Sequence, residues 1–248
     1  MITLQDCGFF SFGKSELRTN QDALLPPIAV KGGYLFGIAD GVGSYIGAEQ
    51  ASQMAIRTLS RLQLPEGEEG YGRLFDQIKL AVASISSRDD AFSEAATTLT
   101  FCHITSSEVR IGHVGDCRVY VKKDGKLEQV TNDHTQHQKL LEQKIYTKSE
   151  LKTMSVKNTL TTAISKSIPL DSQTIIIPID ELINEYGELH IFVMSDGAHH
   201  FWEKRPRFSE NTLSNPNSYV ASLLKRVRRT GPVDDYSCIA LKFLINVN

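Results

Sequence analysis

The residues of this chain best suited to chemistry are aspartates at predicted strand ends and beside glycines. Asp40 and Asp196 each end an apolar run and precede a glycine, and Asp116 follows a glycine. Asp is a poor strand former, and short carboxylates at strand ends present oxygens to hard cations such as Mg²⁺ and Mn²⁺. Any one of these Asp–Gly pairs is more simply explained as a turn. Their repetition, together with Asp22 and Asp234, favours a shared metal site.

Apolar and amphipathic segments supply the elements that would position these carboxylates. Residues 34–40 (YLFGIAD) predict a buried strand that runs into a glycine-rich turn. Residues 47–62 repeat small and apolar side chains at three- and four-residue steps, which predicts an amphipathic helix. A second helix is expected over residues 71–86.

The rest of the chain mixes strands with helices. An antiparallel meander is predicted from residue 96, with a hairpin turn at residues 123–126. Two short helices are expected between residues 131 and 154, followed by a strand at 173–179. The last third predicts a strand at 189–194, a helix at 218–229 and a strand at 236–243. This order indicates the α+β class, and the sequence has no internal repeat.

Composition excludes several classes of protein. The 248 residues carry 27 Lys and Arg against 29 Asp and Glu, a net charge of -2, which argues against a polybasic nucleic-acid binder. With 41% hydrophobic and 23% charged residues, the chain matches ordinary globular usage. We therefore expect one folded domain over residues 1–248.

The sequence also indicates a cellular compartment. No apolar run approaches the roughly 18 residues that a membrane helix needs, so no membrane span is expected. The first residues have neither the basic nor the apolar region of a secretory signal. The 4 cysteines are scattered without a CxxC pair, which favours reduced core thiols. We expect a cytoplasmic protein.

Six segments, in order along the chain, resemble the PP2C-type (PPM) family of metal-dependent protein serine/threonine phosphatases, in its bacterial form. They are RTNQDA (18–23), GIADGVG (37–43), ATTL (96–99), GHVGDCR (112–118), VMSDG (193–197) and DDYS (234–237). Weaker matches at residues 130–134 and 160–164 also fall in the family order. One such motif alone would mean little, but the ordered series is specific.

The resemblance implies a fold and a metal centre. The fold is a four-layer α-β-β-α sandwich, with two antiparallel β-sheets flanked by helices and a variable flap at about residues 132–160. The centre holds two Mn²⁺ or Mg²⁺ ions, which Asp40 bridges and of which the Gly41 carbonyl binds one. Asp196 and Asp234 complete the shell of the other ion, and Asp22 orients the metal-bound waters.

The family also uses an arginine to bind the substrate phosphate, since a guanidinium fork matches two phosphoryl oxygens. Arg18 is the candidate for this catalytic role. It lies four residues before Asp22, whereas the family arginine usually lies five before. Three explanations stay open: the loop is one residue shorter, another basic group serves, or Arg18 is a solvated loop residue.

Four positions depart from the family pattern, and one of them is Ser44, which stands where the family commonly has a second glycine and removes no ligand. Val42 replaces a His or Met, and because it cannot transfer a proton, water or another group must protonate the leaving group. Asp235 replaces an asparagine, and its role is open. His200 stands where members with a third metal often carry an aspartate. A third ion held by Asp116 and His200 is therefore an open question, with an ordinary partly exposed histidine as the alternative.

The function expected from the resemblance is hydrolysis of phosphoserine and phosphothreonine monoesters by a water that the binuclear centre activates. The alternative is a pseudophosphatase that binds a phosphorylated partner with little or no catalysis. The carboxylates are all kept, which argues against it. A two-metal nuclease would need a basic groove, for which the chain offers only a short run at residues 225–229. The expected partners are a phosphorylated protein substrate and a cognate Ser/Thr kinase, with no nucleic acid, and the expected state is a monomer.

Overall fold

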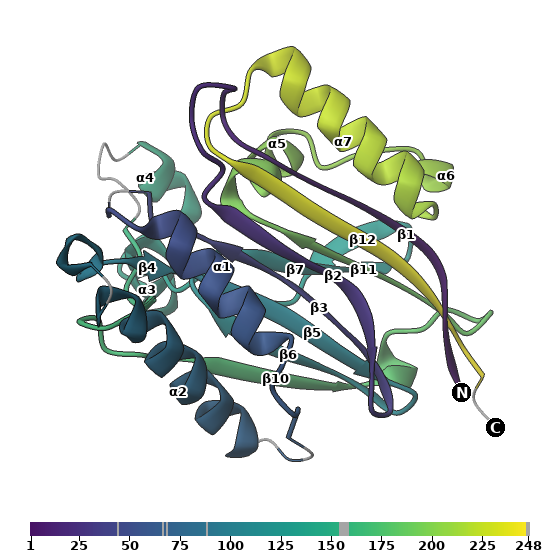
Figure 1. Ribbon diagram of the computed structural model, residues 1–248. Helices are drawn as coiled ribbons and strands as arrows, with labels where there is room; N and C mark the ends of the chain where they lie inside the picture. Colours follow the sequence, from purple (N-terminus) through teal and green to yellow (C-terminus); the bar gives the residue numbers. More distant parts are fainter. Residues whose placement is uncertain (44, 66, 68, 88, 154–158, 247–248) are drawn as a thin grey trace.

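The computed structural model places two five-stranded sheets face to face (Figure 1). It describes residues 1–43, 45–65, 67, 69–87, 89–153 and 159–246. In spatial order the first sheet consists of β1 (Ile2–Phe12), β12 (Tyr236–Ile245), β11 (Glu188–Met194), β7 (Arg118–Lys123) and β8 (Lys126–Gln129). The second consists of β10 (Gln173–Pro178), β6 (Glu108–Val114), β5 (Leu99–Thr105), β3 (Gly33–Asp40) and β2 (Asp22–Val30). Neighbouring strands are antiparallel in both sheets.

The side chains of the sheets alternate between two cores. In β11, Ile191 and Val193 pack between the sheets, whereas Phe192 and Met194 pack toward the helices, and all four are fully buried. This alternation follows from the two-residue period of a strand. Strands buried on both faces read as continuous apolar runs, which is why the sequence predicts this strand correctly.

Helices cover the outer face of each sheet. They are α1 (Ala48–Leu59) and α2 (Glu69–Ala83) on the second sheet, and α5 (Asp196–Lys204), α6 (Glu210–Leu213) and α7 (Pro216–Thr230) on the first (Figure 1). Ala51, Ala55 and Leu59 of α1 are fully buried at the predicted spacing. Asn215 caps α7, because its side-chain oxygen accepts the Ser218 N–H at 2.7 Å. The predicted four-layer α-β-β-α sandwich is confirmed.

Smaller elements complete the fold. They are 3₁₀ turns at Ser84–Ser87, Asp90–Phe92 and Ile179–Glu181, a ladder of β4 (Ala96–Thr97) with β9 (Ile164–Ser165), and the helices α3 (Gln136–Glu142) and α4 (Lys148–Thr153). Helices α3 and α4 occupy the segment predicted as the flap, of which residues 154–158 lie outside the described part. No helix in the described ranges has the length and apolarity to cross a membrane.

The sequence analysis missed several elements, and three of them have a clear physical reason. β1 mixes polar and apolar residues and is irregular between Leu4 and Asp6. β2 contains Pro26 and Pro27, which a central strand does not tolerate, but β2 lies at the sheet edge and its register shifts between Leu25 and Ile28. α5 starts directly at Asp196, where the sequence pattern predicts only a turn.

Candidate active site

The strand register brings the predicted carboxylates to one end of both sheets. Asp22 begins β2 and lies opposite Asp40 at the end of β3. In the other sheet, Asp196 follows β11, Asp234 precedes β12 and Asp116 precedes β7, and these three strands pair side by side. Antiparallel neighbours place the end of one strand beside the start of the next. Carboxylates far apart in the sequence therefore converge on one edge.

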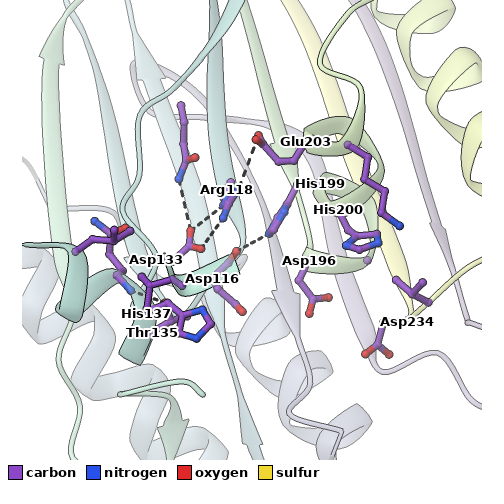
Figure 2. Close-up of a pocket in the computed structure, with 17 residues that line it drawn as sticks. Asp116, Arg118, Asp133, Thr135, His137, Asp196, His199, His200, Glu203 and Asp234 are labelled. Carbon is purple, nitrogen blue, oxygen red and sulfur yellow. Dashed lines mark hydrogen bonds and ion pairs between the residues drawn. The ribbon is translucent and has the colours of Figure 1, made fainter. Parts of the chain in front are cut away.

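Two cavities meet at these carboxylates. A cavity of about 460 Å³ is lined by Asp40, Asp116, Asp196 and Asp234, among other residues. A larger one of about 830 Å³ shares Asp116, Asp196 and Asp234. Figure 2 shows these three side chains around one open region of the larger cavity. The convergence predicted from the sequence is present for the described carboxylates.

Asp22 is the most buried carboxylate of the group, with 7% of its surface exposed. Its Oδ2 accepts hydrogen bonds from the hydroxyls of Ser195 at 2.8 Å and Ser237 at 2.7 Å. Its Oδ1 is buried and has no hydrogen-bond partner in the described part of the chain. Burial raises the pKa of Asp22 to about 7, and repulsion from Asp196 and Asp235 adds to this against the two hydroxyl donors. Asp22 thus keeps one oxygen atom available for a further ligand.

Asp40 and Asp196 also resist ionisation. Burial, with repulsion from Asp22, Asp196, Asp116 and Asp234, raises the pKa of Asp40 well above its usual range. Burial and repulsion from Asp234 raise the pKa of Asp196 to about 6, although a hydrogen bond shared with Asp40 opposes this. The group therefore carries negative charge that needs a counter-ion or protons.

Asp116 shows the same effect. Burial raises its pKa to about 8, with repulsion from Asp196 and Asp133 acting in the same direction and attraction from Arg118 acting against it. It follows Gly115, whose φ of 109° is a conformation that only glycine adopts readily. This glycine lets β6 turn sharply before β7 and brings Asp116 to the sheet edge.

The Asp40-Gly41 turn is held firmly by its backbone. The Asp40 N–H donates to the Thr98 hydroxyl at 3.0 Å, and the Asp40 carbonyl accepts the Thr98 N–H at 2.8 Å. The Gly41 N–H donates to the Gln21 carbonyl at 3.1 Å. A Cβ at Gly41 would press on the carbonyls of Ala48 and Gln21, so the turn requires glycine at this position.

Asp235, whose role the sequence left open, ties the start of β12 to the loop between β1 and β2. Its Oδ1 accepts the Lys14 N–H and its Oδ2 accepts the Gln21 N–H, both at 2.7 Å, and only 3% of the residue is exposed. A Cβ at Gly197 would collide with the Asp235 carbonyl oxygen, so α5 packs directly against this junction. Asp235 thus positions the loop that leads into Asp22.

Arg18 lies on that loop and is exposed. Its guanidinium donates to the side-chain oxygen of Gln21 at 2.7 Å. A Cβ at Gly43 would lie 2.9 Å from the same guanidinium nitrogen, so Arg18 reaches the turn that follows Asp40. Arg18 is outside the residues that line either cavity and lies beside the rim through Gln21 and Gly43.

His200 and Asp116 both line the larger cavity (Figure 2). His200 Nε2 is buried and has no hydrogen-bond partner among the described residues. Burial lowers the pKa of His200, which favours a neutral imidazole. The neighbouring His199 instead bonds the Asp116 carbonyl through Nε2 at 3.1 Å. The structure places the predicted pair in one cavity and shows that His199 anchors the Asp116 backbone.

An ion pair that the sequence analysis missed borders the same cavity. Arg118 donates two hydrogen bonds to the Asp133 carboxylate, at 2.8 and 2.7 Å, and lies 3.7 Å from Glu203 (Figure 2). Tyr120 donates to Glu203 at 2.8 Å. This network joins β7, the first residues of the flap and α5. Both Arg118 and Asp133 fall inside the quoted motifs, but their pairing depends on the three-dimensional fold.

The residues of this edge suit hard divalent cations. No group of three or more His, Cys, Asp or Glu side chains in the described ranges is already arranged as a metal-ligand set. The donor chemistry nevertheless fits, because carboxylate and carbonyl oxygens are the ligands that Mg²⁺ and Mn²⁺ prefer. Asp22 Oδ1 is buried without a partner among the described residues, and burial with mutual repulsion raises the pKa of Asp40 and Asp196. A cation at this edge would replace the protons that these raised pKa values favour.

A family comparison agrees with this geometry. The model of the protein phosphatase 2C family matches residues 14–240. The chain belongs to the protein phosphatase 2C family. This membership confirms the resemblance given by the ordered motifs.

The sequence identity to individual members of the family is limited. The chain is 33% identical to the serine/threonine protein phosphatase PstP of Mycobacterium tuberculosis over 119 residues, which cover 45% of this chain and 23% of PstP. Among solved structures, Stp1 of Staphylococcus aureus superposes with a TM-score of 0.80 at 20% identity, over 96% of this chain and 95% of Stp1. The catalytic domain of PstP in complex with two manganese ions gives a TM-score of 0.72 at 20% identity, over 98% of this chain and 100% of that domain. At this identity the superpositions establish the fold.

Proposed function

We propose that this chain is a metal-dependent protein phosphatase that hydrolyses phosphoserine and phosphothreonine monoesters. The observation that carries the proposal is the convergence of Asp22, Asp40, Asp196 and Asp234 from four strand ends on one edge. Membership of the protein phosphatase 2C family supports the same reaction.

Two Mn²⁺ or Mg²⁺ ions are the proposed cofactors, by analogy with the manganese complex of the PstP domain. Asp40 and the Gly41 carbonyl, together with Asp196 and Asp234, would hold them, with Asp22 beside them. When bound, such ions supply charge stabilisation for the phosphoryl group and lower the pKa of water. A third ion between Asp116 and His200 is part of the proposal, because both residues line one cavity and His200 Nε2 lacks a partner among the described atoms.

The chain's own residues then have distinct tasks. Asp22 Oδ1 would orient the attacking water by accepting a hydrogen bond from it, because Oδ2 is already engaged by two hydroxyls. Arg18 would bind the phosphoryl oxygens through two charge-assisted bonds, while its remaining bond to Gln21 orients the guanidinium. Val42 has no ionisable group, so the leaving alkoxide takes its proton from solvent.

We place this activity in a single catalytic domain that acts as a monomer, since all the proposed ligands come from one chain. The free cysteines, Cys7, Cys102, Cys117 and Cys238, support the cytoplasm as its location. A cognate Ser/Thr kinase would supply its phosphorylated substrate.

The test is release of phosphate from a small aryl phosphate with and without Mn²⁺. Asp40→Asn and Asp196→Asn should each reduce kcat/KM by about a thousandfold or more, a loss of the size seen when key electrostatic groups are removed. The matched control is Asp180→Asn, at an exposed carboxylate in the Ile179–Glu181 turn. Full activity in either site variant, or equal activity with and without metal, would refute the proposal. A folded wild-type protein that binds phosphopeptides without hydrolysing them would indicate a binding module instead.

A further inference from the structure

The cavity of about 460 Å³ has two chemically different walls. One wall is the carboxylate group described above. The other combines apolar side chains with threonines and comes from two segments, the turn after β3 and the segment that carries β9. Its apolar members are Val42, Tyr45, Leu160, Ala163 and Ile168. None of the described residues that line this cavity is a Lys or Arg.

Part of the apolar surface of this wall is accessible. Val42, Tyr45, Leu160 and Ile168 are each only half-buried. Covering apolar surface releases about 25 cal/mol for each Å² removed from water, so an apolar ligand group would gain free energy here. The volume lies within the range of small-ligand pockets, which combine apolar walls with a few polar groups.

The segment that carries Ile168 is held in place before any ligand arrives. The Ile168 carbonyl accepts a hydrogen bond from Lys79 of α2 at 2.7 Å. The Thr162 hydroxyl donates to the Pro169 carbonyl at 3.0 Å and accepts the Asp171 N–H at 2.9 Å. A wall fixed in this way loses little conformational entropy on binding.

The larger cavity differs in character. Its lining includes the charged side chains of Arg118, Asp133, Glu203 and Lys204. Asp116, Asp196 and Asp234 border both cavities. When the phosphorylated residue of a substrate lies at these carboxylates, the substrate residues on one side of it would face the charged side chains of the larger cavity. The residues on the other side would face the apolar side chains of the smaller cavity.

We propose that the smaller cavity is a subsite for an apolar side chain of the substrate, adjacent to its phosphorylated residue. The inference rests on the proposed phosphatase function and adds a class of preferred sequence. The occupant is a flanking aliphatic residue, because the cavity is continuous with the carboxylate site and its other wall carries Val42, Leu160 and Ile168.

Synthetic phosphopeptides test the preference. A nine-residue phosphothreonine peptide is made with Leu, Asn, Lys or Asp at each position from three before to three after the phosphorylated residue, and kcat/KM is measured with Mn²⁺. At one flanking position, Leu should exceed the near-isosteric Asn by about tenfold, the discrimination typical of a hydrophobic pocket. Asp should be the poorest at that position. Equal rates for all four residues, or a preference for Lys, would overturn the subsite.

A matched pair of variants locates the preference. Ile168→Asn should reduce the Leu-to-Asn ratio of kcat/KM to about twofold or less, and Ile168→Ala should reduce it partly. The control is Ile46→Asn, because Ile46 is 68% exposed and lies outside the cavity lining. A ratio unchanged in both Ile168 variants, with thermal unfolding confirming that they are folded, would overturn the assignment to this cavity. Failure of the phosphatase function is distinguishable, since the wild-type protein would then release phosphate from neither aryl phosphate nor any peptide.

Discussion

The carboxylate of Asp235 accepts the backbone N–H of Gln21 at 2.7 Å, joining segments 214 residues apart in the chain. The Gln21 carbonyl in turn accepts the Ser52 hydroxyl at 2.6 Å and the Gly41 N–H at 3.1 Å. The backbone of Gln21, immediately before Asp22, therefore connects the start of β12, α1 and the turn after β3. The geometry of the candidate site depends on this junction as well as on the carboxylates themselves.

Replacement of Asp235 by asparagine should damage both stability and activity. Both groups that face Asp235 are N–H donors, from Lys14 and Gln21, and an asparagine amide would oppose one of them with its own NH₂ group. A buried donor left without an acceptor costs about 1–3 kcal/mol. We expect Asp235→Asn to lower the free energy of unfolding by that amount and kcat/KM for an aryl phosphate by at least about tenfold. Urea unfolding and initial rates measure both effects.

The control for this variant is Asp180→Asn, which removes an exposed carboxylate. It should leave the unfolding free energy and kcat/KM close to their wild-type values. If Asp235→Asn also left both quantities unchanged, the hydrogen bonds from Asp235 to the loop between β1 and β2 would not contribute to stability or activity.

We expect Gln21 to assist phosphate binding by orienting Arg18. Its side-chain oxygen accepts from the Arg18 guanidinium at 2.7 Å, and Arg18 is otherwise an exposed loop residue. We expect Arg18→Ala to raise KM for an aryl phosphate by roughly tenfold or more, in line with loss of a charge-assisted bond. Gln21→Ala should raise KM only severalfold.

A double-mutant cycle separates this coupling from a general effect on the loop. In the Arg18→Ala background, Gln21→Ala should cause no further rise in KM, because the residue that Gln21 orients is gone. Additive effects of the two substitutions would contradict the coupling. Arg57→Ala, at an exposed arginine of α1, provides the control for loss of a positive charge.

Ser237→Ala should weaken metal activation. The Ser237 hydroxyl is fully buried and donates to Asp22 Oδ2 at 2.7 Å, which stabilises the ionised carboxylate. Loss of one such donor favours the protonated form by about 1 kcal/mol or more. We expect the Mn²⁺ concentration for half-maximal activity to rise about fivefold or more, because cations bind the ionised form. Ser84→Ala, at an exposed hydroxyl that donates to the Ala81 carbonyl, should leave that concentration unchanged.

Much of the fold follows from local pattern. The sequence predicts β11 from its continuous apolar run, because this strand is buried on both faces. It predicts α1 from the spacing of its alanines, because this helix buries one face. β2 is not visible, because Pro26 and Pro27 argue against a strand unless its place at the sheet edge is known. The sequence does not predict α5 either, because Asp196-Gly197 has the composition of a turn. The close packing of Gly197 against the Asp235 carbonyl explains the glycine, and this contact is known only from the fold.

The sequence likewise predicts some features of the candidate site and not others. The sequence predicts that Asp40 and Asp196 each lie at a strand end, and the stacking of the two sheets brings these ends to one cavity. The donors to Asp22, which are Ser195 and Ser237, cannot be predicted, since these contacts cross from one sheet to the other. The two amide partners of Asp235 are likewise long-range contacts without a local signal.

Buried histidines and buried carboxyls give the stability of this protein opposite dependences on pH. Burial lowers the pKa of His113 to about 3, and that of His199 to about 3, so both oppose folding below the ordinary histidine pKa of about 6.5. Burial raises the pKa of Asp22 to about 7 and that of Asp116 to about 8. A raised carboxyl pKa means that the folded protein holds protons that the unfolded chain has released, so stability falls as pH rises through the folded value. Above about pH 6.5 the histidines are neutral in both states and the carboxyl effect is isolated.

The metal-free protein should therefore lose stability between pH 6.5 and 8.5, the window set by the pKa values of Asp22 and Asp116, about 7 and about 8. Each carboxyl that still holds its proton contributes a slope of up to about 1.4 kcal/mol per pH unit. Urea unfolding in EDTA measures this slope, and saturating Mn²⁺ should flatten it, because bound cations replace the protons and stabilise the folded state. The double variant Asp22→Asn with Asp116→Asn should also show a flatter slope in EDTA, since neither amide can ionise. Stability that stays constant or rises across this window in EDTA would show that the carboxyls are not packed against one another as the structure places them.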